Sequence, residues 1–315
     1  MDYTEIRVAG VTCKVPALQI NDTTVMVTGR WLKLASIHDE EWQEGEVLPN
    51  PDQFIAEVRR HKRLGADIFT FSQKPNDPAP RFPFYYDWDS IAAVPVISFS
   101  DWWTKRVSTR LRQDVNRAAK RGVVVRSVPF TDDLVRGIVD IYNETPIRQG
   151  RHFWHYKKGF EAVRLENATY LERSEFLGAF LGDELIGFMK IVYADRLARL
   201  MQILSKEAHQ DKRPTNALIA KAVEICEAKG CSHLIYGNYH YSQGADSLTM
   251  FKHRNGFEEI LVPRYYVPLT VKGSLGLYLH LQHGVRALVP ASVLQSLKRV
   301  RAAIYRRSRV AQVTN

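Results

Sequence analysis

Cysteine is scarce in this chain of 315 residues, and its three cysteines, Cys13, Cys226 and Cys231, show no CxxC spacing. This scarcity argues against a disulfide framework or a cysteine-ligated zinc site, and it favours a reducing compartment. Long apolar runs are also missing, since a membrane-spanning helix needs about 20 such residues. Residues 1–5 are acidic with no apolar run behind them, so we expect no signal peptide. We therefore expect a cytoplasmic protein without a metal.

Acidic residues are missing from the end of the chain. The formal net charge is +10, but residues 271–315 hold eight of the Lys and Arg residues and no Asp or Glu. Leu294, Leu297, Val300 and Ile304 have helical spacing beside basic residues. We predict a basic amphipathic helical tail at 271–315. Such a tail could bind RNA or an anionic membrane surface, and the latter would place the protein at the inner face of the membrane. A solvated terminus without a ligand is an equally good interpretation.

Hydrophobic residues make up 45% of the chain, so a buried core is expected. Residues 1–105 are predicted to form a small α/β unit, because their apolar residues are spaced as in alternating strands and a helix. Asn50 as N-cap and Pro51 at the first position indicate a helix start. Phe54, Ile55 and Val58 give that helix one apolar face. Strands are predicted at 25–27, 31–37, 66–71 and 91–97, with a helix end at Gly65 and a proline-rich loop at 72–83.

Residues 106–270 are predicted to form a second α/β unit. Its predicted elements are a basic helical region at 100–122, a strand at 123–128, helices at 131–144 and 156–166, a hairpin of strands 176–181 and 184–193, a strand at 197–204, a helix at 217–229, a strand at 233–238, a helix at 247–254 and a strand at 257–267. Three antiparallel strands followed by a strand–helix–strand crossover predict a mixed sheet. Ligands enter such sheets where the strands split, and the basic loop at 211–216 leads into a helix N-terminus at that point, where phosphates bind.

Three stretches of this second unit resemble the Fem-like branch of the GNAT acyltransferase superfamily, which includes the peptidyltransferases of peptidoglycan bridge synthesis. They are RLRQDVNRAAKRGV at 110–123, RPTNAL at 213–218, and YGN at 236–238 followed by SLTMFKHRNGF at 247–257. The Phe-Lys-x-x-x-Gly-Phe ending is the most specific piece. The resemblance spans about residues 68–269 and implies two tandem GNAT-like domains, the first degenerate and the second catalytic.

The resemblance implies an activated acyl donor, and the loop at 211–216 is where it would bind. Lys212, Arg213, Thr215 and Asn216 are the predicted donor-binding residues. Acetyl-CoA-dependent members carry glycines in this loop, whereas this chain has none, so its backbone cannot approach a pyrophosphate as closely. Acyl-CoA is the predicted co-substrate, and aminoacyl-tRNA is the alternative, which would make tRNA a partner.

The resemblance also implies a catalytic role for Lys252, the lysine of the Phe-Lys pair, in stabilising developing negative charge. From helical spacing alone, Lys252 would be an exposed lysine on an amphipathic helix. Tyr241 is the candidate for protonating the leaving group, on a loop that could equally be a packed aromatic segment; Tyr239 beside it is a candidate for substrate binding. No Ser-His-Asp or Cys-His arrangement is visible, so direct attack by an amine is predicted.

Acceptor binding is predicted in the polar stretch before the helix at 156–166. The candidates are Arg148, Arg151, His152 and Tyr156, of which the arginines could bind phosphate or carboxylate through two hydrogen bonds. A solvated loop is the alternative. The predicted function is N-acyl transfer to an amino group of an amino sugar or cell-envelope precursor. A non-catalytic GNAT scaffold that binds RNA or a membrane, and not DNA, is the competing class.

Overall fold

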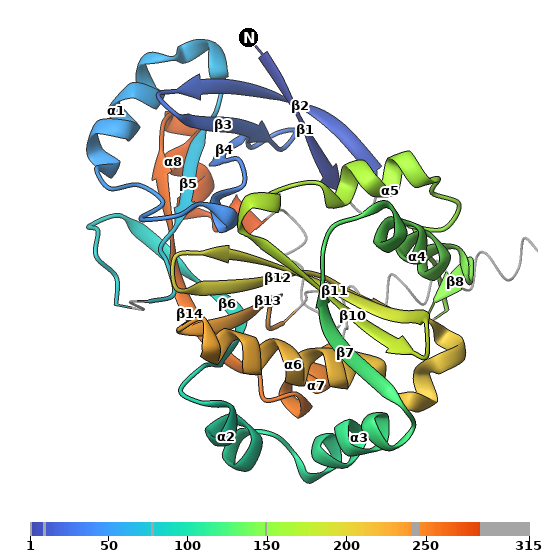
Figure 1. The fold of residues 1–315 in the computed structure, drawn as a ribbon. Coiled ribbons are helices and arrows are strands. Elements are labelled where there is room, and N and C mark those ends of the chain that lie inside the picture. Colours follow the sequence, from blue (N-terminus) through green and yellow to red (C-terminus); the bar gives the residue numbers. More distant parts are fainter. Residues whose placement is uncertain (1, 9–10, 77–78, 149, 241–245, 284–315) are drawn as a thin grey trace, which may run out of the picture.

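The structure is a computed structural model that describes residues 2–8, 11–76, 79–148, 150–240 and 246–283. Its strands form one 12-stranded mixed sheet in the order β1-β2-β3-β4-β5-β14-β6-β13-β12-β11-β10-β7, and a separate hairpin of β8 and β9. Helices cover both faces of the sheet (Figure 1). The mixed α/β fold predicted from the sequence is confirmed.

The N-terminal half of the sheet begins with an antiparallel run of four strands and continues with a helix and a parallel strand. Its elements are β1 (Asp2–Val8), β2 (Val11–Ile20), β3 (Thr23–Thr28), β4 (Leu34–Ile37), the short η1 (Glu40–Trp42), α1 (Pro51–Arg60), η2 (Lys62–Leu64), β5 (Ile68–Ser72) and β6 (Tyr85–Pro95). The strand pairs β1–β2, β2–β3 and β3–β4 are antiparallel, whereas β4 and β5 are parallel.

The C-terminal half repeats this plan, with an antiparallel run followed by a helix and a parallel strand. Its elements are α2 (Phe99–Asp101), η3 (Trp102–Arg106), α3 (Thr109–Lys120), β7 (Val123–Val128), α4 (Asp132–Asn143), β8 (Ile147–Arg148), β9 (Arg151–His152), α5 (Phe160–Asn167), η4 (Leu171–Arg173), β10 (Ser174–Leu181), β11 (Glu184–Ala194), β12 (Leu197–Ser205), η5 (Glu207–Lys212), α6 (Pro214–Ala228), β13 (His233–Asn238), α7 (Asp246–Arg254), β14 (Glu258–Pro268), α8 (Val271–Tyr278) and η6 (Leu281–His283).

The last strand, β14, joins the two halves. It runs antiparallel between β5 and β6, with Tyr265 opposite Phe71 on one side and opposite Tyr86 on the other. The long strand β6 then pairs through its second part with β13. The two units predicted at 1–105 and 106–270 therefore share strands of one sheet, so the chain of the second unit completes the core of the first.

Two helical layers enclose the C-terminal half of the sheet. Phe176 of β10 packs in the apolar cluster beneath α4 and α5, whereas its neighbours Leu177 and Ala179 pack in the cluster beneath α3 and α6. This alternation follows from the two-residue period of a strand. In Figure 1, α6 lies in front of the strands with α3 below it, and α4 with α5 lies above.

Local signals explain why several elements begin where they do. Ser108 and Thr131 are N-caps whose hydroxyls accept hydrogen bonds from Leu111 N and Leu134 N, as their sequence positions predict. The helix expected at 156–166 starts only at Phe160, because Lys157 has a left-handed backbone with φ 67°. The helix expected to run to Gly65 ends at Arg60.

Two further differences concern the ends of the chain. Residues 2–8 and 11–20, for which we predicted no strand, form β1 and β2. Of the predicted tail, residues 271–283 are α8 and η6, whereas 284–315 lie outside the described residues. Within the described part of the chain, no helix combines the length and the apolar character that crossing a membrane requires.

Candidate functional site

The parallel strands β12 and β13 separate after a short paired stretch. Leu197, Ala198 and Arg199 pair with residues 233–235, and β12 then continues to Ser205 alongside β11. Opposite β11, the register of β12 shifts at Met201, which is an extra residue in a β-bulge. Because a bulge bends and twists its strand, it helps to turn β12 away from β13. The sheet thus splits between its parallel strands β12 and β13, as predicted from the sequence for such a pair.

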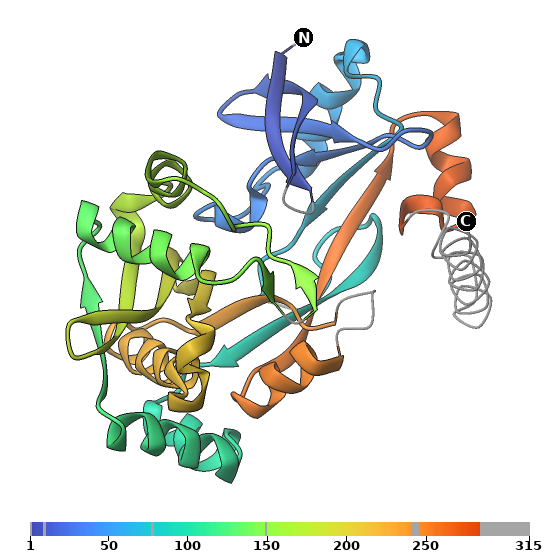
Figure 2. The same ribbon diagram turned by 90° about the vertical axis from the view of Figure 1, so that its right-hand side faces the viewer.

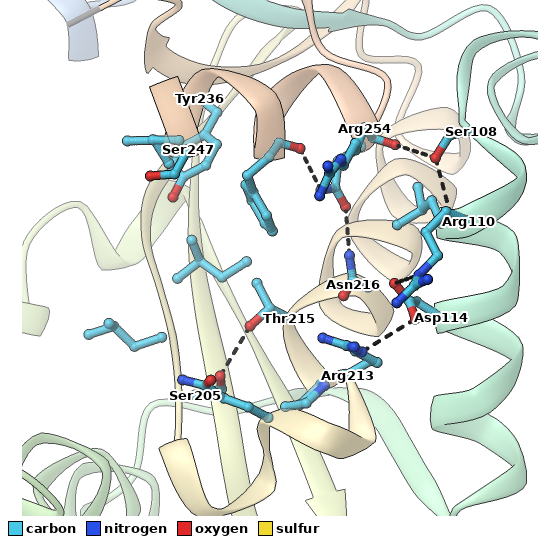
Figure 3. Close-up of a pocket in the computed structure, with 18 of the residues that line it drawn as sticks. Ser108, Arg110, Asp114, Ser205, Arg213, Thr215, Asn216, Tyr236, Ser247 and Arg254 are labelled. Carbon is cyan, nitrogen blue, oxygen red and sulfur yellow. Dashed lines mark hydrogen bonds and ion pairs between the residues drawn. The ribbon is translucent and has the colours of Figure 1, made fainter. Parts of the chain in front are cut away.

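A cavity of about 970 Å³ opens at this split (Figure 3). Its walls come from α3, β8, β12, the start of α6, β13 and α7, elements that are far apart in the chain. The lining residues are Ser108, Arg110, Leu111, Asp114, Arg148, Ile203, Leu204, Ser205, Glu207, Gln210, Arg213, Pro214, Thr215, Asn216, Tyr236, Ser247, Leu248, Phe251, Arg254 and Asn255.

The N-terminus of α6 forms one wall of the cavity. Pro214 occupies its first position, and Arg213, the N-cap, has φ 61° and makes no side-chain capping bond. The first N–H groups of a helix lack partners within it and carry partial positive charge, so this end attracts anions. Arg213 adopts the left-handed conformation that glycine usually takes, which means that the wall has a cationic side chain where a glycine would leave open backbone.

Asp114 of α3 lies between two arginines at the cavity wall. Its carboxylate is 3.5 Å from Arg110 Nε and 3.3 Å from Arg213 Nε, and its side chain is largely buried. Figure 3 shows the three side chains meeting between α3 and the start of α6. Arg254 adds a further cationic side chain to the lining. The four lining arginines outnumber Asp114 and Glu207, so the cavity favours an anionic ligand.

Hydrogen bonds tie the floor of the cavity to the sheet. The hydroxyls of Thr215 and Ser205 are 3.1 Å apart and connect α6 with β12. Arg148 donates to the backbone oxygens of Ser205 at 2.9 Å and Ile141 at 2.8 Å, and lies 3.4 Å from Glu144. Burial lowers the pKa of Arg148, and Glu144 opposes this effect. Arg148 therefore lines the cavity while its guanidinium holds the floor together.

Asn216 and Asn255 connect the start of α6 with the end of α7 at the site. Asn216 Nδ2 donates to Asn255 Oδ1 at 3.2 Å, and Asn255 Nδ2 donates to the backbone oxygen of Phe251 at 2.7 Å. The backbone oxygen of Asn255 accepts a bond from Trp102 Nε1 at 3.1 Å. The glycine of the Phe-Lys-x-x-x-Gly-Phe ending follows directly: Gly256 has φ 77°, and an added Cβ would lie 2.7 Å from Trp102 Nε1.

Lys252 is buried beside the cavity and is not part of its lining. Its ammonium donates to the backbone oxygen of Asn238 and lies 5.1 Å from the centre of the Tyr236 ring. Burial lowers its pKa to about 8. Two of its neighbours do line the cavity: Tyr236, whose ring it faces, and Phe251, which precedes it in the sequence. The structure thus places Lys252 one layer behind the wall, and its catalytic role stays a prediction.

The remaining predicted residues lie elsewhere. Arg151 and His152 are exposed on β9, and Tyr156 packs at the edge of the cluster beneath α4 and α5. Lys212 is paired with Asp211 at 3.4 Å at the end of η5. None of these four is in the cavity lining.

The aromatic pair of the loop after β13 is described only in part. Tyr239 packs at the edge of the core beneath α6, and its ring meets that of His240 at 5.0 Å. Tyr241 lies outside the described residues. The roles assigned to both stay predictions.

Several lining residues escaped sequence reasoning. Asp114 and Arg110 stand four residues apart on the basic helix, a spacing that indicates an ion pair but not which side faces a cavity. Asn255 lies inside the Phe-Lys-x-x-x-Gly-Phe ending, where the resemblance could have drawn attention to it. Arg254 lies in the same ending and Ser247 begins the stretch at 247–257, whereas Ser205 carried no signal. In the described ranges, His, Cys, Asp and Glu side chains form no group of three suited to a metal ion.

No protein-family model and no curated protein sequence matches the chain. Solved structures do. FemX is 11% identical, over 88% of this chain and 90% of that one, with a TM-score of 0.53. The C-terminal domain of a protein described as a lysylphosphatidylglycerol synthetase, from Agrobacterium fabrum, is 14% identical over 83% and 86% of the two chains, with a TM-score of 0.52. L-PGS from Bacillus licheniformis is 14% identical over 82% and 85%, with a TM-score of 0.52.

At these identities the likeness is one of fold. The chain has the Fem-like GNAT fold that its three stretches resemble, and that prediction of fold is confirmed. The division into two domains at residue 105 stays a prediction.

Proposed function

We propose that this protein is an acyltransferase whose donor binds in the cavity where β12 and β13 separate. The observation that carries the proposal is the uncapped N-terminus of α6 at the mouth of that split. A helix N-terminus binds the phosphates of a donor, and strands that part leave backbone groups that can bind its acyl carbonyl. The similarity in fold to FemX and to lysylphosphatidylglycerol synthetases supports this class of function.

The proposed reaction is direct transfer to an amine. The amine nitrogen attacks the carbonyl carbon of the donor, and a C–N bond forms as the bond to the leaving sulfur or oxygen breaks. The leaving atom takes up the proton that the amine loses. The enzyme supplies alignment and hydrogen bonds to the developing oxyanion. The resemblance to the Fem-like branch favours an amino sugar or cell-envelope precursor as the acceptor.

Acyl-CoA, with acetyl-CoA as its simplest form, is the first candidate donor. Its pyrophosphate would lie at the start of α6, on the cavity side of Arg213 and Arg110. Asp114 holds both guanidiniums in place. Charge from these side chains would replace the backbone cradle that glycines provide in related loops.

Aminoacyl-tRNA is the second candidate donor, and two features favour it. Pro214 removes one backbone donor from the phosphate site and Arg213 covers the backbone next to it. In addition, Arg117 and Lys120 are exposed on α3, the helix that forms the cavity wall, and extend its positive charge outwards. A polyanion that reaches beyond the cavity would use this charge.

The experiment compares both donors with one variant. Purified protein is incubated with acetyl-CoA or with an aminoacyl-tRNA and an amino-sugar acceptor, and release of free CoA or deacylated tRNA is followed. Arg213→Gly removes the side chain without backbone strain, because glycine readily adopts φ 61°. We expect this variant to raise the KM for the true donor about tenfold.

Arg136→Ala is the matched control, since Arg136 is an exposed arginine on α4, paired with Asp133 and outside the cavity lining. It should leave the KM unchanged. If neither donor binds saturably to the wild-type protein, the enzyme proposal fails and the non-catalytic scaffold becomes the better interpretation.

A further inference from the structure

One face of α8 is apolar and open to solvent. Val271, Leu275, Tyr278 and Leu279 are 88%, 54%, 81% and 44% exposed. They are spaced three, four or one residue apart, so they lie along one side of the helix. We refer to these four residues as the α8 face. Figure 2 shows α8 at the outer edge of the N-terminal half, away from α3 and α6.

The opposite side of α8 is pressed tightly against the sheet. Gly273, Gly276 and Leu277 are buried there. An added Cβ at Gly273 would lie 1.9 Å from the backbone oxygen of Asp67, and one at Gly276 would lie 2.8 Å from Leu32 Cδ1. The two glycines allow this close approach, which fixes the rotation of the helix. The α8 face is therefore presented outwards by rigid packing.

Aromatic and basic side chains flank the α8 face. Trp31 is 57% exposed, and the ammonium of Lys272 lies 5.2 Å from its ring centre. Residues 59–63 read Arg-Arg-His-Lys-Arg, and Arg59 donates to the backbone oxygen of Pro268 at 3.2 Å, just before α8 begins. Lys62 and Arg63 are exposed. The α8 face, which includes Tyr278, thus has a tryptophan and positively charged side chains beside it.

We propose that the α8 face, with Trp31 and the basic residues 59–63, docks on the surface of an anionic lipid bilayer. Aliphatic side chains would enter the boundary between headgroups and acyl chains, and Trp31 and Tyr278 would lie at headgroup level, where these residue types are enriched. Lysine and arginine beside them would bind anionic headgroups. The chain continues from η6 into residues 284–315, which contain seven Lys and Arg and no Asp or Glu, so its charge suits the same surface.

Other occupants fit the α8 face less well. An RNA ligand would use the basic residues and the aromatic rings, but it offers nothing for Val271 and Leu275. A stable dimer would need to bury about 800 Å² of surface on each partner. Four side chains of one short helix would supply only a small part of that surface. A second copy would also bring the basic residues 59–63 towards each other.

The test is sedimentation of the full chain with vesicles. One set is phosphatidylcholine alone, and in the other about one lipid in three is phosphatidylglycerol. We expect binding to the anionic vesicles that weakens at high salt, and little binding to the neutral ones. The triple variant Val271→Ser, Leu275→Ser and Tyr278→Ser should reduce the partition coefficient at least about tenfold.

Two further variants complete the test. Lys62→Glu with Arg63→Glu should also weaken binding about tenfold and flatten the salt dependence. Leu165→Ser is the matched control, because Leu165 is 77% exposed on α5, and it should bind as wild type does. Wild-type vesicle binding by the triple variant overturns the proposal. The proposal is also overturned if the wild type does not bind vesicles and instead binds an RNA oligonucleotide, or self-associates, through the α8 face.

Discussion

Gly256 shows how a single position of the Phe-Lys-x-x-x-Gly-Phe ending acts through packing. Its backbone turns the chain from α7 into β14 with φ 77°, and its missing side chain leaves room for the Trp102 indole. That indole donates to the backbone oxygen of Asn255, whose side chain in turn meets Asn216 at the cavity wall. A motif position without any chemistry of its own therefore supports the wall.

We predict that Gly256→Ala lowers the free energy of unfolding by about 2–4 kcal/mol, because a Cβ at this φ is strained and also collides with Trp102. Chemical denaturation measures the loss. Gly230→Ala is the control, since Gly230 has φ 67° but open space around it, and it should cost only about 1 kcal/mol. Equal losses in both variants would show that the contact with Trp102 is unimportant.

The burial of Lys252 should make the stability of the protein depend on pH. Burial lowers its pKa to about 8 in the folded protein, whereas an unfolded chain has the ordinary lysine pKa near 10.4. Between these two values the unfolded state binds more protons, so this lysine makes the protein more stable as pH rises through that window. We expect the stability of the wild type relative to Lys252→Met to increase from pH 8 to about pH 10.

Urea denaturation of both proteins at several pH values checks this prediction. Lys221→Met is a suitable control, because Lys221 is a more exposed lysine paired with Glu224 on α6. A difference between wild type and Lys252→Met that stays constant with pH would contradict a lowered pKa at Lys252.

At the scale of elements, the first turn of α8 depends on one carboxylate. Asp67 accepts hydrogen bonds from Lys33 N at 2.9 Å, Thr270 Oγ1 at 3.0 Å and Lys272 Nζ at 3.0 Å. Burial by itself would raise the pKa of Asp67, but these hydrogen bonds outweigh it, so that the pKa is lowered. The charged form of Asp67 thus fastens the start of α8 to the segment before β5.

We predict that the contribution of Asp67 is present above its unfolded pKa, near pH 4, and is lost as pH falls through its lowered folded pKa. Asp67→Asn should therefore be less stable than wild type at pH 7, with a difference that shrinks towards pH 3. Thermal unfolding at both pH values measures this. A difference that is as large at pH 3 as at pH 7 would rule out the charge as its cause.

At the scale of the whole molecule, strand exchange makes the two halves one body. β14 carries Tyr265, which packs with Phe69 and Phe71 in the N-terminal core, although the strand follows the helices of the C-terminal half. Arg264 of the same strand pairs with Asp89 of β6 at 2.5 Å and with Glu40 of η1. Unfolding the N-terminal half would therefore remove a neighbour of β6 beside the split sheet.

We predict a single unfolding transition for the entire described body. Phe69→Ala, at a fully buried position of the N-terminal core, should lower its free energy of unfolding by about 3–5 kcal/mol. Donor binding and tryptophan fluorescence should be lost together, because the core of one half supports the strands of the other. Leu165→Ala, at an exposed position, should leave the midpoint unchanged. Two separate transitions, with donor binding following only the second, would contradict this prediction.

The elements that sequence reasoning predicted well depend on neighbours in the chain. Ser108 and Thr131 cap helices three residues ahead of the N–H groups that they bind, and the turn at Gly182 joins adjacent strands. By contrast, β1 and β2 lacked a clear local pattern and obtain their order from pairing with each other and with β3. Local spacing therefore explains helix starts and hairpins better than it explains strand partners.

The same distinction holds for the candidate site. The loop at 211–216 could be singled out because a helix start and its basic residues are local features, and Arg213, Thr215 and Asn216 do line the cavity. That the loop binds phosphate stays a prediction. Lys212, in the same loop, does not, because η5 directs it towards Asp211. The hydrogen bond of Asn216 to Asn255 and the ion pair of Arg213 with Asp114 join residues of different helices, which no local spacing could reveal.

The sequence by itself determined the helix and hairpin order, the Fem-like stretches and the positive charge at the end of the chain. Only the tertiary structure decided that the split between β12 and β13 is a cavity, that Lys252 lies behind its wall, and that β14 belongs to the core of the other half. The physical reason is range. Capping and periodicity act over a few residues, whereas strand pairing, burial and ion pairs depend on which distant segments the packed sheet brings together.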